Sequence, residues 1–266
     1  MKRIDFVWPE GKIGALTTSW DDATIHDRHL VEILNHHGMK GTFNVNSGHL
    51  HMDNRIAADE VKKLYAGQEV AVHTVTHPWL ERQPEDMVMS EVIGDRLALE
   101  ALVGYPVRGM ALPQGTYDAR VLRILAEAGI LYVRPTAIEE CRFNLPGNFM
   151  EWKVTCHHKA DLKALWHEFL ILDKWSTHRL FYLWGHSYEF HNDGNWDQIE
   201  AFAKLAGKTP DIWFATNMEI YDYVTAWRKL QCSVDVSSIK NTAAVTVWYH
   251  GEKGISCIRP GEIIAL

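Results

Sequence analysis

The sequence of 266 residues is long enough for one α/β barrel or two small domains, and its 47% hydrophobic content allows a sizeable core. A net charge of −7 gives no electrostatic reason to expect nucleic acid or an anionic membrane as a partner. The N-terminal residues lack the apolar run of a signal peptide, and no stretch approaches the roughly 20 apolar residues of a membrane span. Cys141, Cys156, Cys232 and Cys257 lie far apart without a C-x-x-C pair, which indicates neither a disulfide framework nor a thiolate zinc site. We therefore expect a reduced, cytoplasmic protein.

Strand-like runs alternate with helix-like runs over most of the chain, a pattern typical of a parallel sheet wrapped in helices. The expected strands cover residues 13–20, 40–45, 69–73, 107–112, 130–134, 149–156, 179–185 and 211–215. The expected helices cover residues 27–37, 56–65, 84–102, 118–128 and 160–174. A loop through Asn195 then leads into a helix that ends at Leu205. The last expected helix begins with a capping box at residues 216–219 and ends at about Leu230. Seven or eight such βα units predict an α/β fold, a regular or distorted (β/α) barrel.

Two segments depart from this pattern. Residues 135–148 form a long polar stretch, and a loop of that length inside a compact domain usually has a functional or partner role. Residues 231–266 contain short alternating runs at 243–249, 254–258 and 262–266, which predict three or four antiparallel strands. We expect residues 1–230 to form the barrel and residues 231–266 to form a β extension packed on it. Whether the extension serves in dimer contacts or covers one barrel end stays open.

Two adjacent acids, Asp21 and Asp22, follow the first expected strand directly. A strand end that opens onto a helix is where α/β proteins place their chemistry. Neighbouring residues on a strand point to opposite faces, so the two carboxylates are suited to separate tasks, one holding a cation and the other moving a proton. The alternative is that one of them caps the following helix.

Two further groups fall at expected strand ends. His73 and His77 are four residues apart, and Pro78 favours a turn over a helix at this point. Two imidazoles and one carboxylate would leave a metal with open positions, the arrangement of a hydrolytic site. His186 leaves an apolar strand through Gly185 and is well placed to face a pocket, although a surface histidine is the alternative.

Together and in this order, these stretches resemble the polysaccharide deacetylase family, also called carbohydrate esterase family four. The family's T-F-D-D-G motif is matched in part by residues 19–23, its H-[ST]-x-x-H motif in full by residues 73–77, and its L-x-x-H motif by residues 183–186. The resemblance covers roughly residues 10–225, and it implies the family's distorted (β/α) barrel.

The resemblance also implies a role for each matching residue. Asp22, His73 and His77 would hold a divalent metal, with zinc expected and Co²⁺, Ni²⁺ or Fe²⁺ as alternatives. Asp21 would be the general base that takes a proton from the metal-bound water, and His186 the acid that protonates the leaving amine. The metal and a backbone N–H near residues 114–116 could stabilise the oxyanion.

The third motif of the family, R-x-P-Y, aligns with residues 111–114, where both the Arg and the Tyr are absent. That Arg normally pairs with the base Asp and keeps its pKa low. Arg134 is the nearest replacement, because adjacent barrel strands place their ends side by side, and Arg108 is a rival. The alternative is that Arg134 is a partly exposed strand-end residue.

A third set of residues is expected to contact substrate: Pro113, Gln114, Gly115, Trp184, Glu189 and His157. His157 and His158 could instead cap the next helix. Glu189 could orient His186, bind sugar hydroxyls or simply lie on the surface.

The sequence therefore predicts a metal-dependent hydrolase that removes acetyl from an N-acetylated amino sugar or oligosaccharide. A hydrolase of a non-sugar cyclic amide is one alternative, and a catalytically inactive carbohydrate-binding barrel is another that the missing Arg and Tyr keep open. Retention of Asp21 and His186 argues against the binder, which needs neither base nor acid. An N-acetylated saccharide is the expected partner, with no nucleic acid or membrane, and a homo-oligomer is compatible with the sequence.

Overall fold

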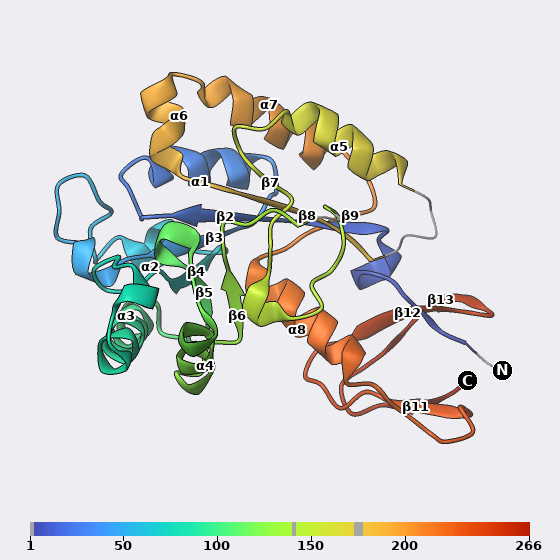
Figure 1. Cartoon of the computed structure of the whole chain (residues 1–266). Coiled ribbons are helices and arrows are strands. Elements are labelled where there is room, and N and C mark those ends of the chain that lie inside the picture. Colours follow the sequence, from blue (N-terminus) through green and yellow to red (C-terminus); the bar gives the residue numbers. More distant parts are fainter. Residues whose placement is uncertain (1–2, 140–141, 173–177) are drawn as a thin grey trace.

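A parallel sheet with helices packed around it makes up most of the chain in the computed structural model, which describes residues 3–139, 142–172 and 178–266 (Figure 1). The strands run in the order β6-β5-β4-β3-β2-β8-β7, and β9 pairs with β2 outside this path. Their bounds are β2 Gly14–Asp21, β3 Gly41–Val45, β4 Glu69–Val72, β5 Gly109–Ala111, β6 Tyr132–Arg134, β7 Cys156–His157, β8 Arg179–Gly185 and β9 Ile212–Phe214. This confirms the predicted distorted (β/α) barrel.

The β2 strand is the centre of the sheet, and all its residues are buried. One edge pairs with β8 along residues 14–20. The other edge is shared, because residues 14–16 pair with β9 and residues 18–21 pair with β3. All these pairs are parallel, so the carboxyl ends of β2, β3 and β8 lie next to one another.

Side chains on β2 alternate between two cores, as the strand period of two requires. Leu16 and Trp20 point into the larger apolar cluster with Leu30 and Leu34 of the helix that follows β2. Ala15 faces the opposite way, into the barrel interior. Asp21 has the same parity as Ala15, so the strand itself directs its carboxylate into the mouth of the barrel.

The segment expected to form a strand at residues 149–156 does so only at its end, so that prediction is mostly wrong. Phe149–Glu151 is a single 3-10 turn (η5), and the only strand residues are those of β7. The segment still follows β6, because the N–H of Trp152 donates to the carbonyl of Val133 at 2.9 Å. It therefore partly bridges β6 and β8 without completing a regular barrel wall.

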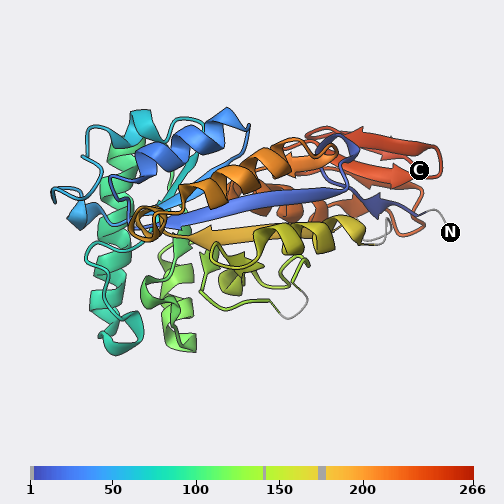
Figure 2. The same cartoon turned by 90° about the horizontal axis from the view of Figure 1, so that it is seen from above.

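The helices are α1 Asp27–His36, α2 Val61–Leu64, α3 Glu85–Val103, α4 Ala119–Glu127, α5 Leu162–Ile171, α6 Ser187–Asp193, α7 Trp196–Gly207 and α8 Asn217–Arg228. Figures 1 and 2 show α1, α5, α6 and α7 packed around β2 and β8, with α3 and α4 beyond the β4–β6 side. The predicted capping box at the start of α8 is present. Two predictions are corrected: the helix expected at residues 56–65 is only α2, and the loop expected before Asn195 contains α6. The last residues of the helix expected at 160–174 lie outside the described part.

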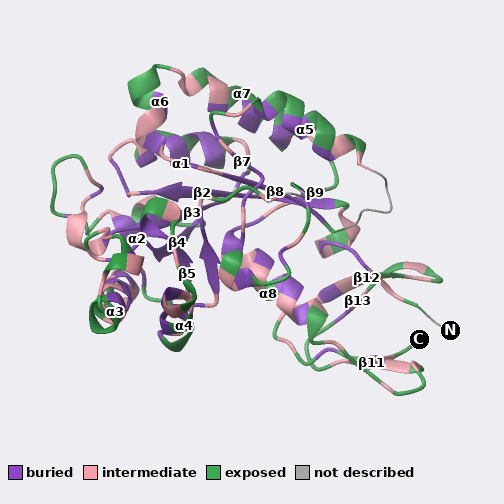
Figure 3. Ribbon diagram, viewed as in Figure 1, coloured by how far each residue is buried: buried purple, intermediate pink, exposed green. Residues whose placement is uncertain are grey.

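The predicted antiparallel strands of the C-terminal tail are present. They are β10 Gln231–Cys232, β11 Ser238–Lys240, β12 Val247–Gly251, β13 Gly254–Ile258 and β14 Ile263–Ala265. They form two small sheets, and β1 (Asp5–Phe6) from the other end of the chain joins the one that contains β12. Figure 3 shows that this part carries far more exposed residues than the buried parallel sheet. A boundary at residue 230 stays a prediction.

Within the described residues, no helix has both the length and the apolar character needed to cross a membrane. Cys156, Cys232 and Cys257 are free thiols, and Cys141 lies outside the described residues.

Candidate active site

The two adjacent acids diverge because the strand ends between them. Asp21 is the last residue of β2, and Asp22 has a positive φ of 81° that turns the chain away. The N–H of Asp22 donates to the carbonyl of Asn44 at 3.0 Å, which fixes this turn to the end of β3. The Asp21 side chain is almost fully buried, whereas that of Asp22 is 16% exposed. The two carboxylates therefore occupy different environments.

His73 and His77 lie on the turn that follows β4, as predicted from Pro78. Thr74 and His77 both have a positive φ, of 67° and 59°, and the N–H of His77 donates to the Thr74 hydroxyl at 3.1 Å. This tight turn brings the two rings to a centroid separation of 4.8 Å. Both imidazoles then face Asp22.

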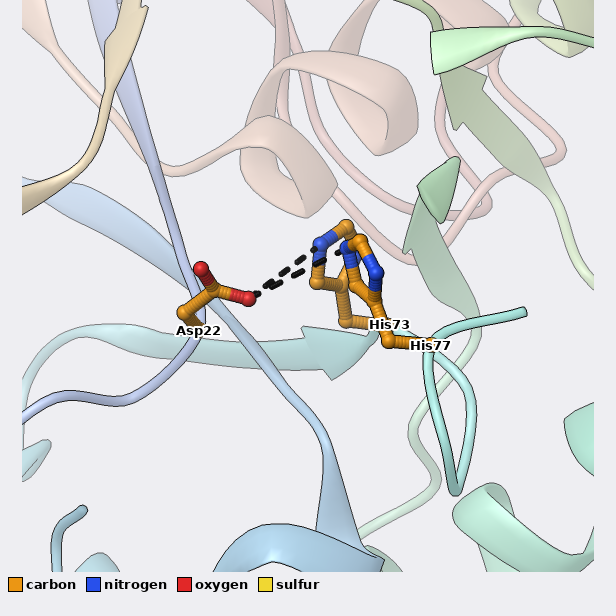
Figure 4. Close-up of side chains that lie close together, drawn as sticks. All are labelled: Asp22, His73 and His77. Atoms are coloured by element: carbon orange, nitrogen blue, oxygen red, sulfur yellow. Dashed lines mark ion pairs between the residues drawn. The ribbon is translucent and has the colours of Figure 1, made fainter. Parts of the chain in front are cut away.

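Asp22, His73 and His77 form a candidate metal-binding group (Figure 4). Asp22 Oδ1 lies 3.9 Å from His73 Nε2 and 4.0 Å from His77 Nε2. Ligand atoms that sit about 2.0–2.2 Å from one ion are about 3–4 Å apart, so this spacing suits a single cation.

The tautomer of His73 is also that of a metal ligand. Its Nδ1 donates to the carbonyl of Ala111 at 2.8 Å, which leaves the lone pair of Nε2 directed at Asp22. Burial lowers the pKa of His73, which favours the neutral ring that metals require. One carboxylate and two imidazoles fit a divalent metal with open coordination positions.

The carboxylate of Asp21 is anchored on one oxygen and directed into the site with the other. Oδ1 accepts hydrogen bonds from the Asn44 amide at 2.8 Å and from the guanidinium of Arg134. Oδ2 lies 3.9 Å from Nε2 of both His73 and His186. Burial raises the pKa of Asp21, but the positive charge of Arg134 and the two imidazoles outweigh it, and the pKa falls to about 2. The group is therefore an ionised proton acceptor at neutral pH.

Arg134 is the arginine that pairs with Asp21, and its side chain is completely buried. Its alternative interpretation as a partly exposed residue is therefore wrong. Ala111, which stands where the third family motif has Arg, pairs directly with Arg134 across β5 and β6. The guanidinium thus enters the same place from the neighbouring strand, and it lies 4.7 Å from the centre of the Trp184 ring. The rival Arg108 donates instead to the carbonyl of Gly129.

His186 reaches the site because it follows β8, whose last residue pairs with Trp20 next to Asp21. Its Nδ1 donates to Glu189 Oε2 at 3.0 Å, so Nε2 faces Asp21. Burial acts to lower the pKa of His186, but the hydrogen bond to Glu189 and the charges of Asp21 and Asp22 outweigh it, so the pKa is raised. A protonated His186 facing the site can act as an acid.

Glu189 is a shared hydrogen-bond acceptor beneath this site. Its Oε2 also accepts from Nε2 of His157 at 3.1 Å and of His158 at 3.0 Å, and its Oε1 accepts from Lys159 at 3.0 Å. His157, His158 and Glu189 also lie close enough together to hold a metal ion. Because these contacts are hydrogen-bond lengths and Lys159 already compensates the charge, we interpret the cluster as support for His186. Glu189 is thus not a free surface residue.

The packing of His158 beneath His186 requires a glycine at position 185. A Cβ at Gly185 would lie 2.2 Å from the ring of His158, closer than any side chain allows. Glycine at the end of β8 therefore lets the buried His158 pack directly below the strand end that carries His186.

The predicted substrate contacts are placed unevenly. Pro113 is buried, and the N–H of Gly115 already donates to the carbonyl of Leu112, so it is not available to an oxyanion. Gln114 is exposed, and its amide lies 3.2 Å from His77 Nδ1. Trp184 lies edge-on to His157, with ring centroids 4.6 Å apart. Their roles in substrate binding stay predictions.

Sequence reasoning missed two features of the site. Asn44 holds Asp21 and was detectable, because it is an amide near the end of a buried strand. A cavity of about 340 Å³ adjoins Asp22 and is lined by Thr24, Asn54, Arg55 and Tyr188 among others. Arg55 lies in a loop with no pattern that marks it.

Glu189→Gln should move the alkaline limb of the kcat/KM profile to lower pH. The carboxylate raises the pKa of His186, so its removal makes the ring lose its proton at a lower pH. The acidic limb should not move with it, because Asp21 has a pKa of about 2. A pH–rate series on both proteins measures this, with Asp193→Asn, which removes another acid that contacts Lys159, as the control. An unshifted alkaline limb would show that Glu189 does not control His186.

The fold and the group at its strand ends define an α/β barrel with a candidate divalent-metal site beside a buried carboxylate–arginine pair. Residues 10–133 match the family model of polysaccharide deacetylases. This match covers a little under half of the chain, and it confirms the resemblance to the polysaccharide deacetylase family that the motifs indicated. No curated protein sequence matches the chain.

Among solved structures, a candidate polysaccharide deacetylase from Mycobacterium smegmatis shares 17% identity, with a TM-score of 0.65 over 86% of this chain and 96% of that one. The pseudoenzyme BA3943 of carbohydrate esterase family four, from Bacillus anthracis, shares 17% identity, with a TM-score of 0.51 over 81% of this chain and 67% of that one. The deacetylase PplD of Streptococcus pyogenes, in complex with acetate, shares 24% identity, with a TM-score of 0.44. The likeness covers 45% of this chain and 55% of that one. The family-model match supports a carbohydrate deacetylase.

Proposed function

We propose that the protein is a metal-dependent hydrolase that removes the acetyl group from an N-acetylated amino sugar or oligosaccharide. The observation that carries the proposal is the buried Asp21–Arg134 pair, which lies beside the Asp22, His73 and His77 group and opposite His186. The candidate base, metal ligands and acid thus lie together at the ends of β2, β4 and β8.

Asp22, His73 and His77 would hold the metal, with Zn²⁺ expected and Co²⁺, Ni²⁺ or Fe²⁺ as alternatives. The metal, when bound, supplies a Lewis acid that lowers the pKa of water and polarises the acetyl carbonyl. Asp21 accepts the proton of the attacking water on Oδ2, the oxygen that faces the site. His186 donates a proton from Nε2 to the leaving amine, while Glu189 holds its Nδ1.

The same arrangement argues against a catalytically inactive binder. Binding alone does not require a buried carboxylate kept ionised by an arginine, because burying such a pair is not in itself stabilising. The arginine absent from the third motif is supplied by the adjacent strand, so the pairing that the motif provides is retained.

Acetate release from N-acetylglucosamine oligosaccharides of increasing length, by protein loaded with each of the four metals, tests the proposal. Acetate formation that is lost on chelation and restored by metal is the expected result. Turnover confined to cyclic amides would replace the proposal with the non-sugar alternative, and saccharide binding without any product would replace it with the binder.

A further inference from the structure

The cavity of about 340 Å³ next to Asp22 is lined by an arginine, Arg55, whose side chain has no partner among the described residues. Arg55 makes no side-chain hydrogen bond and no ion pair with any described residue, and its Nε is buried without an acceptor. Other arginines of the chain are engaged, for example Arg28 with Glu60 and Arg123 with Glu85. A guanidinium retained in a cavity without an acceptor is suited to an anionic ligand, because burial without one is unfavourable.

The backbone fixes Arg55 relative to the candidate metal group. Residues 54–56 run antiparallel to the turn that follows Asp22, with a bridge between Arg55 and Thr24. The N–H of Ile25 donates to the carbonyl of Asn54 at 3.2 Å, and the N–H of Ile56 donates to that of Ala23 at 2.8 Å. Arg55 is therefore tied to the same turn that carries Asp22, and the two residues line one cavity.

The charges around the cavity leave Arg55 available. Asp22 is the only acid among the lining residues, and its Oδ1 faces His73 and His77. A divalent cation held there would compensate the Asp22 charge. The remaining lining residues add polar groups: Thr24, His26, Asn54, Tyr188 and Asn192. The cavity thus combines one permanent cation with hydrogen-bonding groups, next to the place where the acyl group would react.

We propose that the substrate carries an anionic group, a carboxylate or a phosphate, which Arg55 binds while the acyl group lies at Asp22, His73 and His77. This rests on the proposed function, since it places the anion relative to a reacting acyl group. A guanidinium can bind either anion through two parallel hydrogen bonds, and an acidic N-acetylated sugar is therefore the preferred class over a neutral one.

Calorimetric binding to the metal-loaded Asp21→Asn protein tests the inference without turnover. The probes are N-acetylglucosamine, N-acetylmuramic acid and N-acetylglucosamine 6-phosphate. We expect one of the two acids to bind about tenfold to a hundredfold more tightly than the neutral sugar, the range of a charge-assisted hydrogen-bonded pair. The acid that is preferred identifies carboxylate or phosphate as the recognised group.

Arg55→Met, added to the Asp21→Asn protein, should abolish the preference for the acid and leave the affinity for N-acetylglucosamine unchanged. Arg55→Lys in the same protein should keep part of the preference. Arg123→Met, which removes the same charge from the exposed face of α4, is the matched control and should keep the full preference. Equal binding of all three probes, no binding of either acid, or a preference that survives Arg55→Met would overturn the inference. Acetate release by the wild-type protein is measured with the same probes. No acetate from any probe would count against the proposed function, whereas acetate without a preference for either acid would count against anion binding by Arg55.

Discussion

Arg134→Met should lower kcat/KM by about 10²–10³-fold and leave the bound metal unchanged. Arg134 contacts the Asp21 carboxylate and none of the candidate metal ligands by hydrogen bond or ion pair within the described chain. Without the guanidinium, the largest of the charges that offset burial is lost, so the pKa of Asp21 rises from about 2. The acidic limb of the pH–rate profile should therefore move to higher pH. Metal analysis by mass spectrometry and a pH series of kcat/KM measure both effects.

Two companion variants keep this prediction interpretable. Arg108→Met removes the rival arginine, whose Nε donates to the Gly129 carbonyl away from Asp21, and should leave turnover near that of the wild type. Arg134→Lys keeps a positive charge near Asp21 and should recover part of the activity. Removing one partner of a buried ion pair costs about 3–5 kcal/mol, so the thermal midpoint of each variant must be recorded with its kinetics. Unchanged turnover in a folded Arg134→Met protein contradicts the assigned role.

The features that the sequence predicts well are those carried by neighbouring residues. The buried run of β2 with two acids at its end, and the histidine pair in a turn that Pro78 indicates, each depend on a few consecutive positions. Parallel strands then bring their ends together without further information, which is why the ligand group could be anticipated. Arg134 was reachable by the same reasoning, since the register of β5 and β6 places it beside Ala111.

The features that escaped prediction depend on contacts between distant segments. Residues 149–156 are rich in aromatic and β-branched side chains, yet the Asn148 side chain caps the Met150 N–H and starts a 3-10 turn there. The convergence of His157, His158 and His186 on Glu189 requires β7 and β8 to be adjacent. The position of Arg55 in its loop is set by backbone hydrogen bonds to the turn after Asp22. The composition of a loop does not indicate such hydrogen bonds.

The two adjacent acids should lose activity for different reasons when each is replaced by its amide. Asp21→Asn should reduce kcat by about 10²–10⁴-fold, because the amide cannot accept the proton. Its metal content should stay full, because Asp22, His73 and His77 are unchanged. Asp22→Asn should lower metal content, because a neutral amide is a poorer ligand than a carboxylate for these metals, and activity should return in part at higher metal concentration.

Metal stoichiometry after dialysis, together with initial rates at increasing metal concentration, separates these outcomes. Asp21→Asn also leaves Arg134 buried without its counter-charge, so circular dichroism and a thermal midpoint must show that the variant is folded. Loss of metal from Asp21→Asn to the same extent as from Asp22→Asn would make both carboxylates ligands. In that case the base would have to come from elsewhere, because the strand end at β2 would no longer divide the two acids between a cation and a proton.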